Sequence, residues 1–150
     1  MLKVVGDLEA DGFVDSATRI WCGVFQNLET GELYIFTQNQ MKEMTQFLDT
    51  CSDLIMHNGI DYDKPLMKKL LNYEYKGQII DTYIMSQVDK PNRDGGHSVE
   101  NWGKILGVKK QEHSEWDKFS WRMVNRCAKD TLIQTLIFKR LYSNLRGIND

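Results

Sequence analysis

Apolar and polar residues follow the period of a β-strand over the first forty positions of the chain. Residues 4–11 read V-V-G-D-L-E-A-D, residues 19–28 are rich in Ile, Trp, Val and Phe, and residues 33–37 are mostly apolar. Turn sequences separate the three runs, with an Asp-Gly pair after the first and E-T-G-E after the second. Strands joined by short turns of this kind predict an antiparallel meander.

The spacing of apolar residues then changes to that of a helix. Helices are predicted at residues 38–50, from residue 64 onward, at 82–88, at 98–106 behind a serine cap, and from about 119 to about 145. Short apolar runs predict two more strands at 53–57 and 78–81, and the segment 89–96 is typical of a loop. The last helix is expected to turn one face to the sheet, formed by Val124, Cys127, Ala128, Thr131, Leu132 and Leu136. This order implies an α/β fold in which helices flank one mixed sheet, as a single domain over residues 1–150.

The composition narrows the class of protein. With 41% hydrophobic and 27% charged residues, it is typical of a soluble globular domain. The sequence has no apolar run near the ~20 residues of a membrane helix and no signal peptide at its start, so we expect a cytoplasmic protein that does not use a membrane. Cys22, Cys51 and Cys127 are odd in number and form no CxxC pair, which argues against a disulfide framework or a structural zinc site and predicts three small core residues.

Charge is distributed unevenly along the chain. Residues 1–60 contain three basic and nine acidic side chains, and residues 61–150 contain sixteen and twelve, so the two parts carry formal charges of −6 and +4. An acidic centre beside a basic rim suits a metal-dependent enzyme that acts on a polyanion, although most charged runs are solvated faces. The basic side chains available for phosphate contacts are Lys64, Lys68, Lys109, Lys110, Lys118, Arg122 and Lys129.

Asp7 and Glu9 are the first candidates for such a centre. Residues two apart in a strand point to the same face, so the two carboxylates would stand together, where they repel each other unless a cation lies between them. A strand that simply enters a polar turn is the alternative. Asp63 at a helix start and Asp130 on the apolar face of the last helix can complete a set of four. Carboxylates suit Mg²⁺ or Mn²⁺, and two such ions ~4 Å apart can activate a water for phosphodiester hydrolysis.

At this point the sequence resembles the DnaQ-like, or DEDD, superfamily of 3′–5′ exonucleases. More narrowly, it is similar to the proofreading exonuclease domain of family A phage replicative DNA polymerases. The resemblance is carried by D-L-E-A-D-G at 7–12, C-G-V at 22–24, H-N-G-I-D-Y-D at 57–63, D-T-Y-I-M-S at 81–86, H-S-V-E-N-W-G at 97–103 and C-A-K-D-T at 127–131. It extends to about residue 145 and implies a ribonuclease H-like fold.

The resemblance also implies roles for single residues. Asp7 would bridge two Mg²⁺ or Mn²⁺ ions, Glu9 and Asp130 would complete the ligands of the first ion, and Asp63 would hold the second, largely through water.

Three further residues match positions that contact the substrate in that family. Asn58 would support the loop or the substrate strand. Phe13 would be the apolar wedge that stacks on the terminal bases, unless it is tucked into the core. Tyr62 matches the aromatic residue of the second motif, where a packing role is the alternative.

The sequence departs from the family in its third motif. The positions that hold a water-orienting tyrosine or histidine are occupied here by Arg126 and Asn125. Arginine stays protonated and cannot act as a base, but Arg126 can pair with Asp130, contact a phosphate or stabilise the leaving group. Either the metals alone activate the water, or His97 or His113 enters the site, although a surface histidine is the more common case.

The function that the resemblance implies is metal-dependent 3′–5′ exonucleolytic digestion of single-stranded or frayed DNA, with release of nucleoside 5′-monophosphates. A separate polymerase or replication protein is the expected partner, and the host cytoplasm is the expected location if the chain is phage-encoded. Two alternatives stay open. One is an exoribonuclease or oligonucleotide-degrading enzyme on the same fold, and the other is a catalytically silent module that binds nucleic acid.

Overall fold

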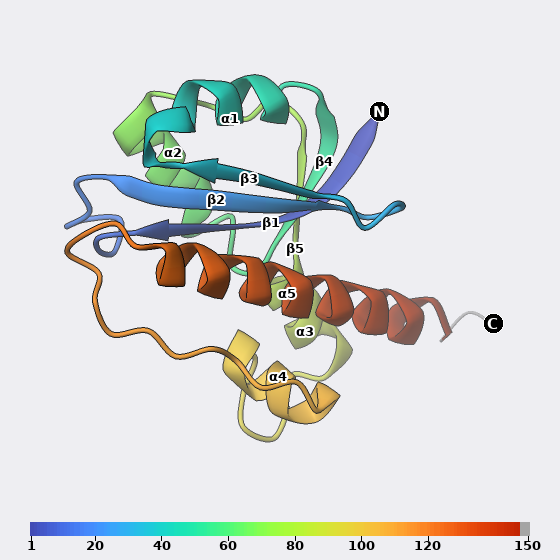
Figure 1. Cartoon of the computed structure of the whole chain (residues 1–150). Helices are drawn as coiled ribbons and strands as arrows, with labels where there is room; N and C mark the ends of the chain where they lie inside the picture. The colour runs from blue at the N-terminus through green and yellow to red at the C-terminus, as the bar shows by residue number, and fades with distance from the viewer. Residues whose placement is uncertain (148–150) are drawn as a thin grey trace.

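A five-stranded sheet with the order β3-β2-β1-β4-β5 lies at the centre of the protein, for which a computed structural model describes residues 1–147 (Figure 1). The strands are β1 (Leu2–Ala10), β2 (Ile20–Asn27), β3 (Leu33–Thr37), β4 (Cys51–Met56) and β5 (Gln78–Asp81). The first three are antiparallel neighbours, whereas β4 runs parallel to β1 and β5 runs parallel to β4. The mixed sheet and its N-terminal meander are therefore confirmed.

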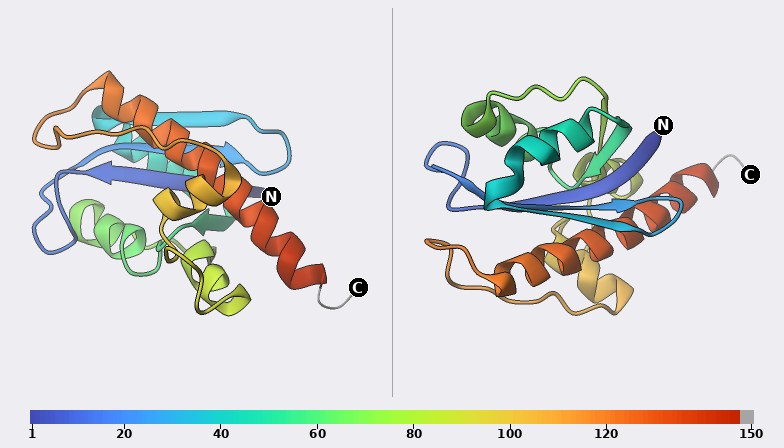
Figure 2. Two further views of the ribbon diagram at one scale, coloured as in Figure 1. Left: turned by 90° about the horizontal axis from the view of Figure 1, so that it is seen from below. Right: turned by 45° about the horizontal axis from the view of Figure 1, so that its top comes forward.

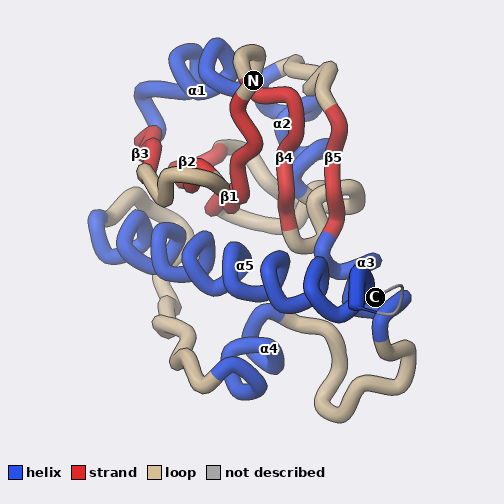
Figure 3. The backbone as a smooth tube through the Cα atoms, turned by 90° about the vertical axis from the view of Figure 1, so that its right-hand side faces the viewer, coloured by secondary structure: helices blue, strands red, loops and turns tan. Residues whose placement is uncertain are grey.

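Helices cover both faces of the sheet. They are α1 (Met41–Leu48), α2 (Asp63–Leu71), α3 (Thr82–Asp89), α4 (Val99–Leu106) and α5 (Trp121–Gly147). The helices α1 and α2 lie on one face, and α5 crosses the other face with α3 and α4 packed beside it (Figures 2 and 3). None of the helices in the described part of the chain is both long and apolar enough to cross a membrane.

The main hydrophobic core lies between the sheet and the α1/α2 layer. Phe25 on β2 is fully buried there, and its ring contacts those of Phe36 and Phe47 at centroid distances of 6.1 and 5.9 Å. Met44 and Leu54 are also fully buried in this cluster. On the opposite face α5 contributes to two smaller apolar clusters, one with β2 and one with α4.

Local signals fix the ends of two of the helices. The side chain of Ser98 accepts a hydrogen bond from the Asn101 N–H, so it caps α4 as the sequence predicts. The helix expected over residues 38–50 is instead divided into a 3₁₀ turn, η1 (Gln38–Gln40), and α1. The side chain of Gln40 accepts from the Thr37 N–H at 3.0 Å, which closes a tight turn before the α-helix begins.

The face of α5 that meets the sheet differs from the predicted one. Val124, Cys127 and Thr131 are buried as expected, but Leu132 and Leu136 are 38% and 43% exposed. The prediction was wrong for these two because a helix turns by about 100° per residue, which carries both out of the buried stripe. The positions that continue the buried stripe are Asp130, Ile133, Gln134, Ile137 and Leu141.

Candidate active site

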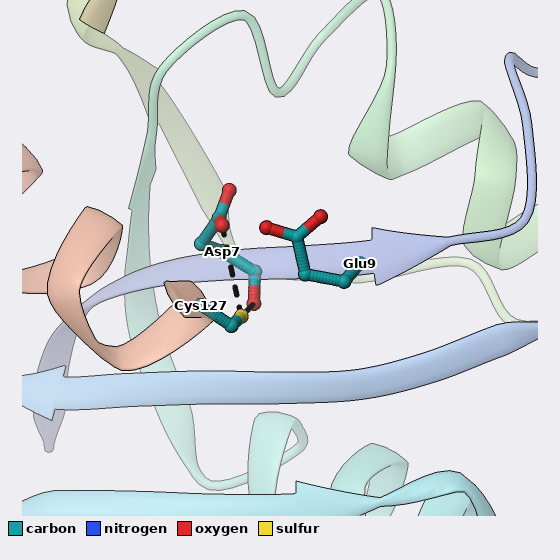
Figure 4. Close-up of side chains that lie close together, drawn as sticks. All are labelled: Asp7, Glu9 and Cys127. Atoms are coloured by element: carbon teal, nitrogen blue, oxygen red, sulfur yellow. Dashed lines mark hydrogen bonds between the residues drawn. The ribbon is translucent and has the colours of Figure 1, made fainter. Parts of the chain in front are cut away.

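The strand β1 brings two carboxylates together on the α5 face of the sheet. Asp7 pairs with Val24 of β2, and Glu9 pairs with Cys22 in the same register. Because alternate residues share a face, both carboxylates project to the same side of β1 (Figure 4). One oxygen of each carboxylate and the Sγ atom of Cys127 on α5 all lie within 4.8 Å of one another.

Two further carboxylates are buried with an oxygen that has no hydrogen-bond partner. Asp63 is the first residue of α2 and is 2% exposed, and Asp130 on α5 is 5% exposed. Within residues 1–147 neither Asp63 Oδ1 nor Asp130 Oδ1 has a hydrogen-bond partner. A buried anionic oxygen without a donor costs several kcal/mol unless a cation compensates for it. Carboxylate oxygens are the preferred ligands of Mg²⁺ and Mn²⁺, so these residues fit such an ion.

The pKa values of the four carboxyl groups are raised by burial, and the charge of Asp7 raises those of the other three further. Burial raises the pKa of Asp7, against the hydrogen bond from Gln134. Burial, followed by the charge of Asp7, raises the pKa of Glu9 to about 10, that of Asp130 to about 7, and that of Asp63 well above its ordinary value. Asp7 therefore stands within electrostatic reach of the other three groups. We refer to Asp7, Glu9, Asp63 and Asp130 as the carboxylate cluster. In the absence of a cation, these four groups hold protons at a pH at which ordinary carboxyl groups are ionised.

Two basic side chains reach the cluster. Arg126 Nη1 lies 3.6 Å from Glu9 Oε2, and Lys110 Nζ lies 3.8 Å from Asp130 Oδ2. Arg126 also donates from Nε to the Gln111 carbonyl oxygen at 3.1 Å, and its guanidinium stacks on Trp116 at 4.6 Å from the ring centroid. Of the three roles considered for Arg126, a pairing with Asp130 is not what the structure shows, because the α4–α5 connection holds the guanidinium beside Glu9 and supplies Lys110 to Asp130.

The histidines are occupied by contacts outside the cluster. His57 bonds through its ring to Thr82 Oγ1 at 2.8 Å and to the His97 carbonyl oxygen at 2.6 Å, and burial lowers its pKa. The His97 ring bonds to the Ser86 hydroxyl at 2.7 Å. The His113 ring packs edge-to-face with Trp116 and contacts the Glu115 carbonyl oxygen. The structure places His97 and His113 in loop contacts and brings neither to the carboxylates, and Asn125 is exposed.

Asn58 lies in the loop between β4 and Asp63. Its φ of 64° is in the left-handed region, which asparagine tolerates better than most residues. Its N–H donates to Asp81 Oδ1 at 2.8 Å, and Asp81 Oδ1 also accepts from the Tyr83 N–H at 2.9 Å to cap α3. The structure therefore gives Asn58 a role in shaping this loop, with its side chain exposed.

Tyr62 connects this loop to the one between β1 and β2. Its hydroxyl donates to the Gly12 carbonyl oxygen at 3.1 Å. Burial, followed by the charges of Asp63 and Glu9, raises the pKa of Tyr62. Tyr62 thus packs against the hydrophobic core and is hydrogen-bonded to Gly12, which precedes Phe13.

Phe13 stands out from the β1–β2 loop with 82% of its surface exposed. The possibility that it is tucked into the core is therefore wrong. The loop itself is well braced: Asp11 Oδ1 accepts from the Thr18 N–H at 2.7 Å, and Lys69 Nζ donates to the Val14 carbonyl oxygen at 2.6 Å. An exposed aromatic ring on a loop held from both sides is free to contact a ligand.

Sequence reasoning missed two residues that contact Asp7. Gln134 donates from Nε2 to Asp7 Oδ1 at 3.2 Å and accepts the His57 N–H on Oε1 at 3.2 Å, so it links β1 to the end of β4. Cys127 Sγ lies 3.6 Å from Asp7 Oδ2. The signal for Gln134 was present, because it is a polar residue one helical turn beyond Asp130 on the same face.

No protein-family profile matches the chain. The chain is 24% identical to the DNA-directed DNA polymerase of Escherichia phage T7, in an alignment that covers 94% of this chain and 27% of the polymerase. The chain thus spans about a quarter of the length of that relative.

Solved structures share the fold. Brucella melitensis NrnC bound to pGG has a TM-score of 0.77 at 16% identity, covering 98% of this chain and 74% of NrnC. NrnC is also known with bound Mg²⁺. Escherichia coli RNase D, an exoribonuclease involved in structured RNA processing, has a TM-score of 0.70 at 14% identity, covering 98% of this chain and 40% of RNase D. The resemblance to phage DNA polymerases is confirmed in sequence, and the solved structures confirm the ribonuclease H-like fold.

Proposed function

We propose that this chain is a metal-dependent 3′–5′ exonuclease that removes nucleotides from single-stranded or frayed DNA and releases nucleoside 5′-monophosphates. One observation carries the proposal. In addition to the neighbouring carboxylates of Asp7 and Glu9, the buried residues Asp63 and Asp130 each have an oxygen, Oδ1, without a hydrogen-bond partner in residues 1–147. A buried carboxylate oxygen that lacks a donor favours a bound cation, because without one it lowers the stability of the fold.

The proposed ligands of two Mg²⁺ or Mn²⁺ ions are the carboxylates of the cluster. Asp7 would contact both ions, Glu9 and Asp130 the first, and Asp63 the second through water. Such ions lower the pKa of a bound water and stabilise the leaving oxygen of a phosphodiester. Gln134 would hold Asp7 in place, because its amide already donates to Asp7 Oδ1.

Arg126 and Lys110 are the proposed contacts of the scissile phosphate. Both are cations that lie close to carboxylates of the cluster. Arg126 is held in place by its contacts with Gln111 and Trp116, and the side chain of Lys110 is only 27% exposed. A fixed positive charge beside the reacting phosphate stabilises the charge that develops on it. Arg126 would therefore serve as an electrostatic residue, without acting as a base.

The loops above the cluster would hold the 3′-terminal nucleotide. Phe13 offers an exposed ring on which a base can stack, an interaction that does not depend on base identity. Tyr62 fixes this loop through its bond to Gly12, and Asn58 shapes the neighbouring loop. We propose that these three residues position the end of the strand for the attacking water.

A basic cleft would hold the rest of the strand. Between α4, the following connection and the first turns of α5 lies a cleft of about 930 Å³, and Lys110 and Arg126 belong to its lining. Its further basic residues are Lys104, Lys109 and Arg122. Because the two residues that reach the carboxylates also line the cleft, a strand whose 3′ end occupies the cluster can continue into it.

RNA is the second candidate substrate, and a specific observation favours it. RNase D, which shares the fold, is an exoribonuclease. Single-stranded DNA has the stronger support, because the relative in sequence is a DNA polymerase. A separate polymerase or replication protein would be the partner of a DNA-directed enzyme, and we propose a single exonuclease domain over residues 1–150 that acts in the cytoplasm.

The test is a digestion of DNA and RNA strands of the same sequence, labelled at the 3′ or the 5′ end, with Mg²⁺ or Mn²⁺. We expect single-nucleotide shortening from the 3′ end that stops with chelator and in Asp7→Asn. Asp94→Asn is the matched control, because it makes the same change on an exposed loop. Mn²⁺ should raise the melting temperature of the wild type and of the control but not of Asp7→Asn. Retention of intact strands in a gel shift, with no cleavage under either metal, would identify the silent binding module instead.

A further inference from the structure

The thiol of Cys127 lies at the carboxylate cluster and has no part in the proposed reaction. Its Sγ donates to the Asp7 carbonyl oxygen at 3.3 Å and lies 3.6 Å from Asp7 Oδ2 (Figure 4). Together with one oxygen each of Asp7 and Glu9 it forms a set of ligand atoms within 4.8 Å of one another. Mg²⁺ and Mn²⁺ prefer oxygen, so the sulfur matters only for a softer ion.

The spacing of these atoms suits a tetrahedral ion. Zinc binds sulfur at about 2.3 Å and carboxylate oxygen at about 2.0 Å, and a tetrahedral angle between such bonds separates the two ligand atoms by about 3.5 Å. Cys127 Sγ and Asp7 Oδ2 are 3.6 Å apart, so both can bind the same ion with little movement.

A further donor lies on the same helix. Asp130 follows Cys127 by three residues and therefore lies on the same side of α5. It is 5% exposed, and its Oδ1 atom has no hydrogen-bond partner in residues 1–147. The charge of Asp7 contributes to the raised pKa of Asp130, so the two carboxyl groups lie within electrostatic reach of each other.

We propose that the site has a second metal-binding mode, in which a thiophilic divalent cation such as Zn²⁺ binds Cys127, Asp7 and Glu9 and blocks the nuclease. As the metal–sulfur bond forms, the thiol proton passes to solvent and no electron is transferred. The ion takes up the two carboxylates that the proposed Mg²⁺ or Mn²⁺ ions require, so the two modes exclude each other. The inhibitory consequence rests on the proposed function, whereas the binding mode itself does not.

Cobalt(II) is the probe for this mode, because it replaces zinc and shows its ligands in its absorption spectrum. The experiment titrates the metal-free protein, residues 1–150, with Co²⁺, followed by Zn²⁺ as competitor. We expect a sulfur-to-metal charge-transfer band in the near ultraviolet that Zn²⁺ abolishes. In Cys127→Ser the band should be lost and the affinity for Zn²⁺ should fall at least about tenfold.

The other two cysteines provide matched controls. Cys22 packs beside Cys127, and Cys51 lies in the core on the other face of the sheet. The band should persist in Cys22→Ser and in Cys51→Ser. A band that survives in Cys127→Ser, or that disappears in a folded Cys22→Ser, would overturn the assignment to Cys127.

A measurement on the wild type covers the case in which Cys127→Ser does not fold. X-ray absorption at the zinc edge should show one sulfur at about 2.3 Å among the ligands, and a shell of oxygen and nitrogen alone would overturn the proposal. These readouts do not use nuclease activity. A chain that binds Co²⁺ through sulfur but digests no strand would contradict the proposed function alone, and digestion with Mn²⁺ in a chain without the band would contradict this inference alone.

Discussion

The two faces of the central sheet bury different kinds of side chain. Under α1 and α2 the contacts are apolar, with Phe25, Met44 and Leu54 fully buried. Under α5 the buried stripe includes polar residues: Asp130, Thr131, Gln134 and Thr135. Apolar burial stabilises a fold without further partners, whereas buried carboxylates do so only when a cation neutralises them. The side under α1 and α2, the apolar face, therefore provides stability. The side under α5, the polar face, is less stabilising because it contains the residues of the proposed binding site.

The largest expected effect comes from a substitution on the polar face. Asp130→Asn removes a proposed metal ligand, so the rate of 3′ digestion should fall about 1,000-fold or more, which corresponds to about 4 kcal/mol of lost transition-state stabilisation. In chelator near neutral pH the same variant should be at least as stable as the wild type, because a neutral amide is easier to bury than a carboxylate. Digestion kinetics and thermal unfolding measure the two effects. Equal digestion rates would remove Asp130 from the site.

On the apolar face the effects should be reversed. Leu54→Ala leaves a cavity where the side chain is fully buried, and should cost about 2–5 kcal/mol of unfolding free energy. The value of kcat/KM per folded molecule should stay unchanged. Urea unfolding and digestion below the unfolding transition measure both. Leu132→Ala is the matched control, because that side chain is 38% exposed and its loss should cost less than about 0.5 kcal/mol.

The polar face should also make the stability of the metal-free protein fall as the pH rises. The pKa of Asp130 is about 7 in the folded protein against 3.8 for an ordinary aspartate, and that of Glu9 is about 10 against 4.5. The folded state therefore binds these protons more tightly than the unfolded chain does. Their contribution is complete below about pH 4 and is lost as the pH rises through the folded pKa values, a change of the order of a few kcal/mol.

Thermal unfolding in chelator between about pH 5 and about pH 9 tests this sign. The melting temperature should decrease across the range, and saturating Mn²⁺ should flatten the profile, since bound metal takes the place of the protons. Glu9→Gln should flatten the upper part of the profile in chelator, and Asp94→Asn should leave it unchanged. A melting temperature that increases with pH in chelator would contradict the mutual burial of these groups.

The apolar face could be predicted from the sequence because its information is local. Strand alternation places Val4 and Leu8 on one side of β1 and Asp7 and Glu9 on the other, and the turn at residues 29–32 sets the meander. The same alternation predicted that the two carboxylates stand together. Periodicity was enough for both results, since each depends on residues that are neighbours along one strand.

The polar face could be predicted only in part, because its contacts join residues far apart in the chain. Local spacing allowed Arg126 to pair with Asp130, one helical turn away, as one of three possible roles. The α4–α5 connection instead brings Trp116 and the Gln111 carbonyl to the guanidinium, and the carboxylate that it pairs with is that of Glu9. Nothing in the local pattern around Lys110 shows that it reaches Asp130. Cys127 was expected to be a small core residue, and it is buried, but its contact with Asp7 depends on how α5 crosses β1.

The smallest expected effect concerns Phe13, which belongs to neither face. Because the ring is 82% exposed, Phe13→Ala should change the unfolding free energy by no more than about 0.5 kcal/mol. Loss of base stacking should weaken strand binding by about 1–3 kcal/mol, to a similar extent for all sequences. KM for oligonucleotides of different sequence measures this loss. Tyr142→Ala is the control, because that ring is also exposed but lies near the far end of α5. A loss of stability in Phe13→Ala without a change in KM would mean that the ring supports the loop, and the stacking role would then have to be assigned elsewhere.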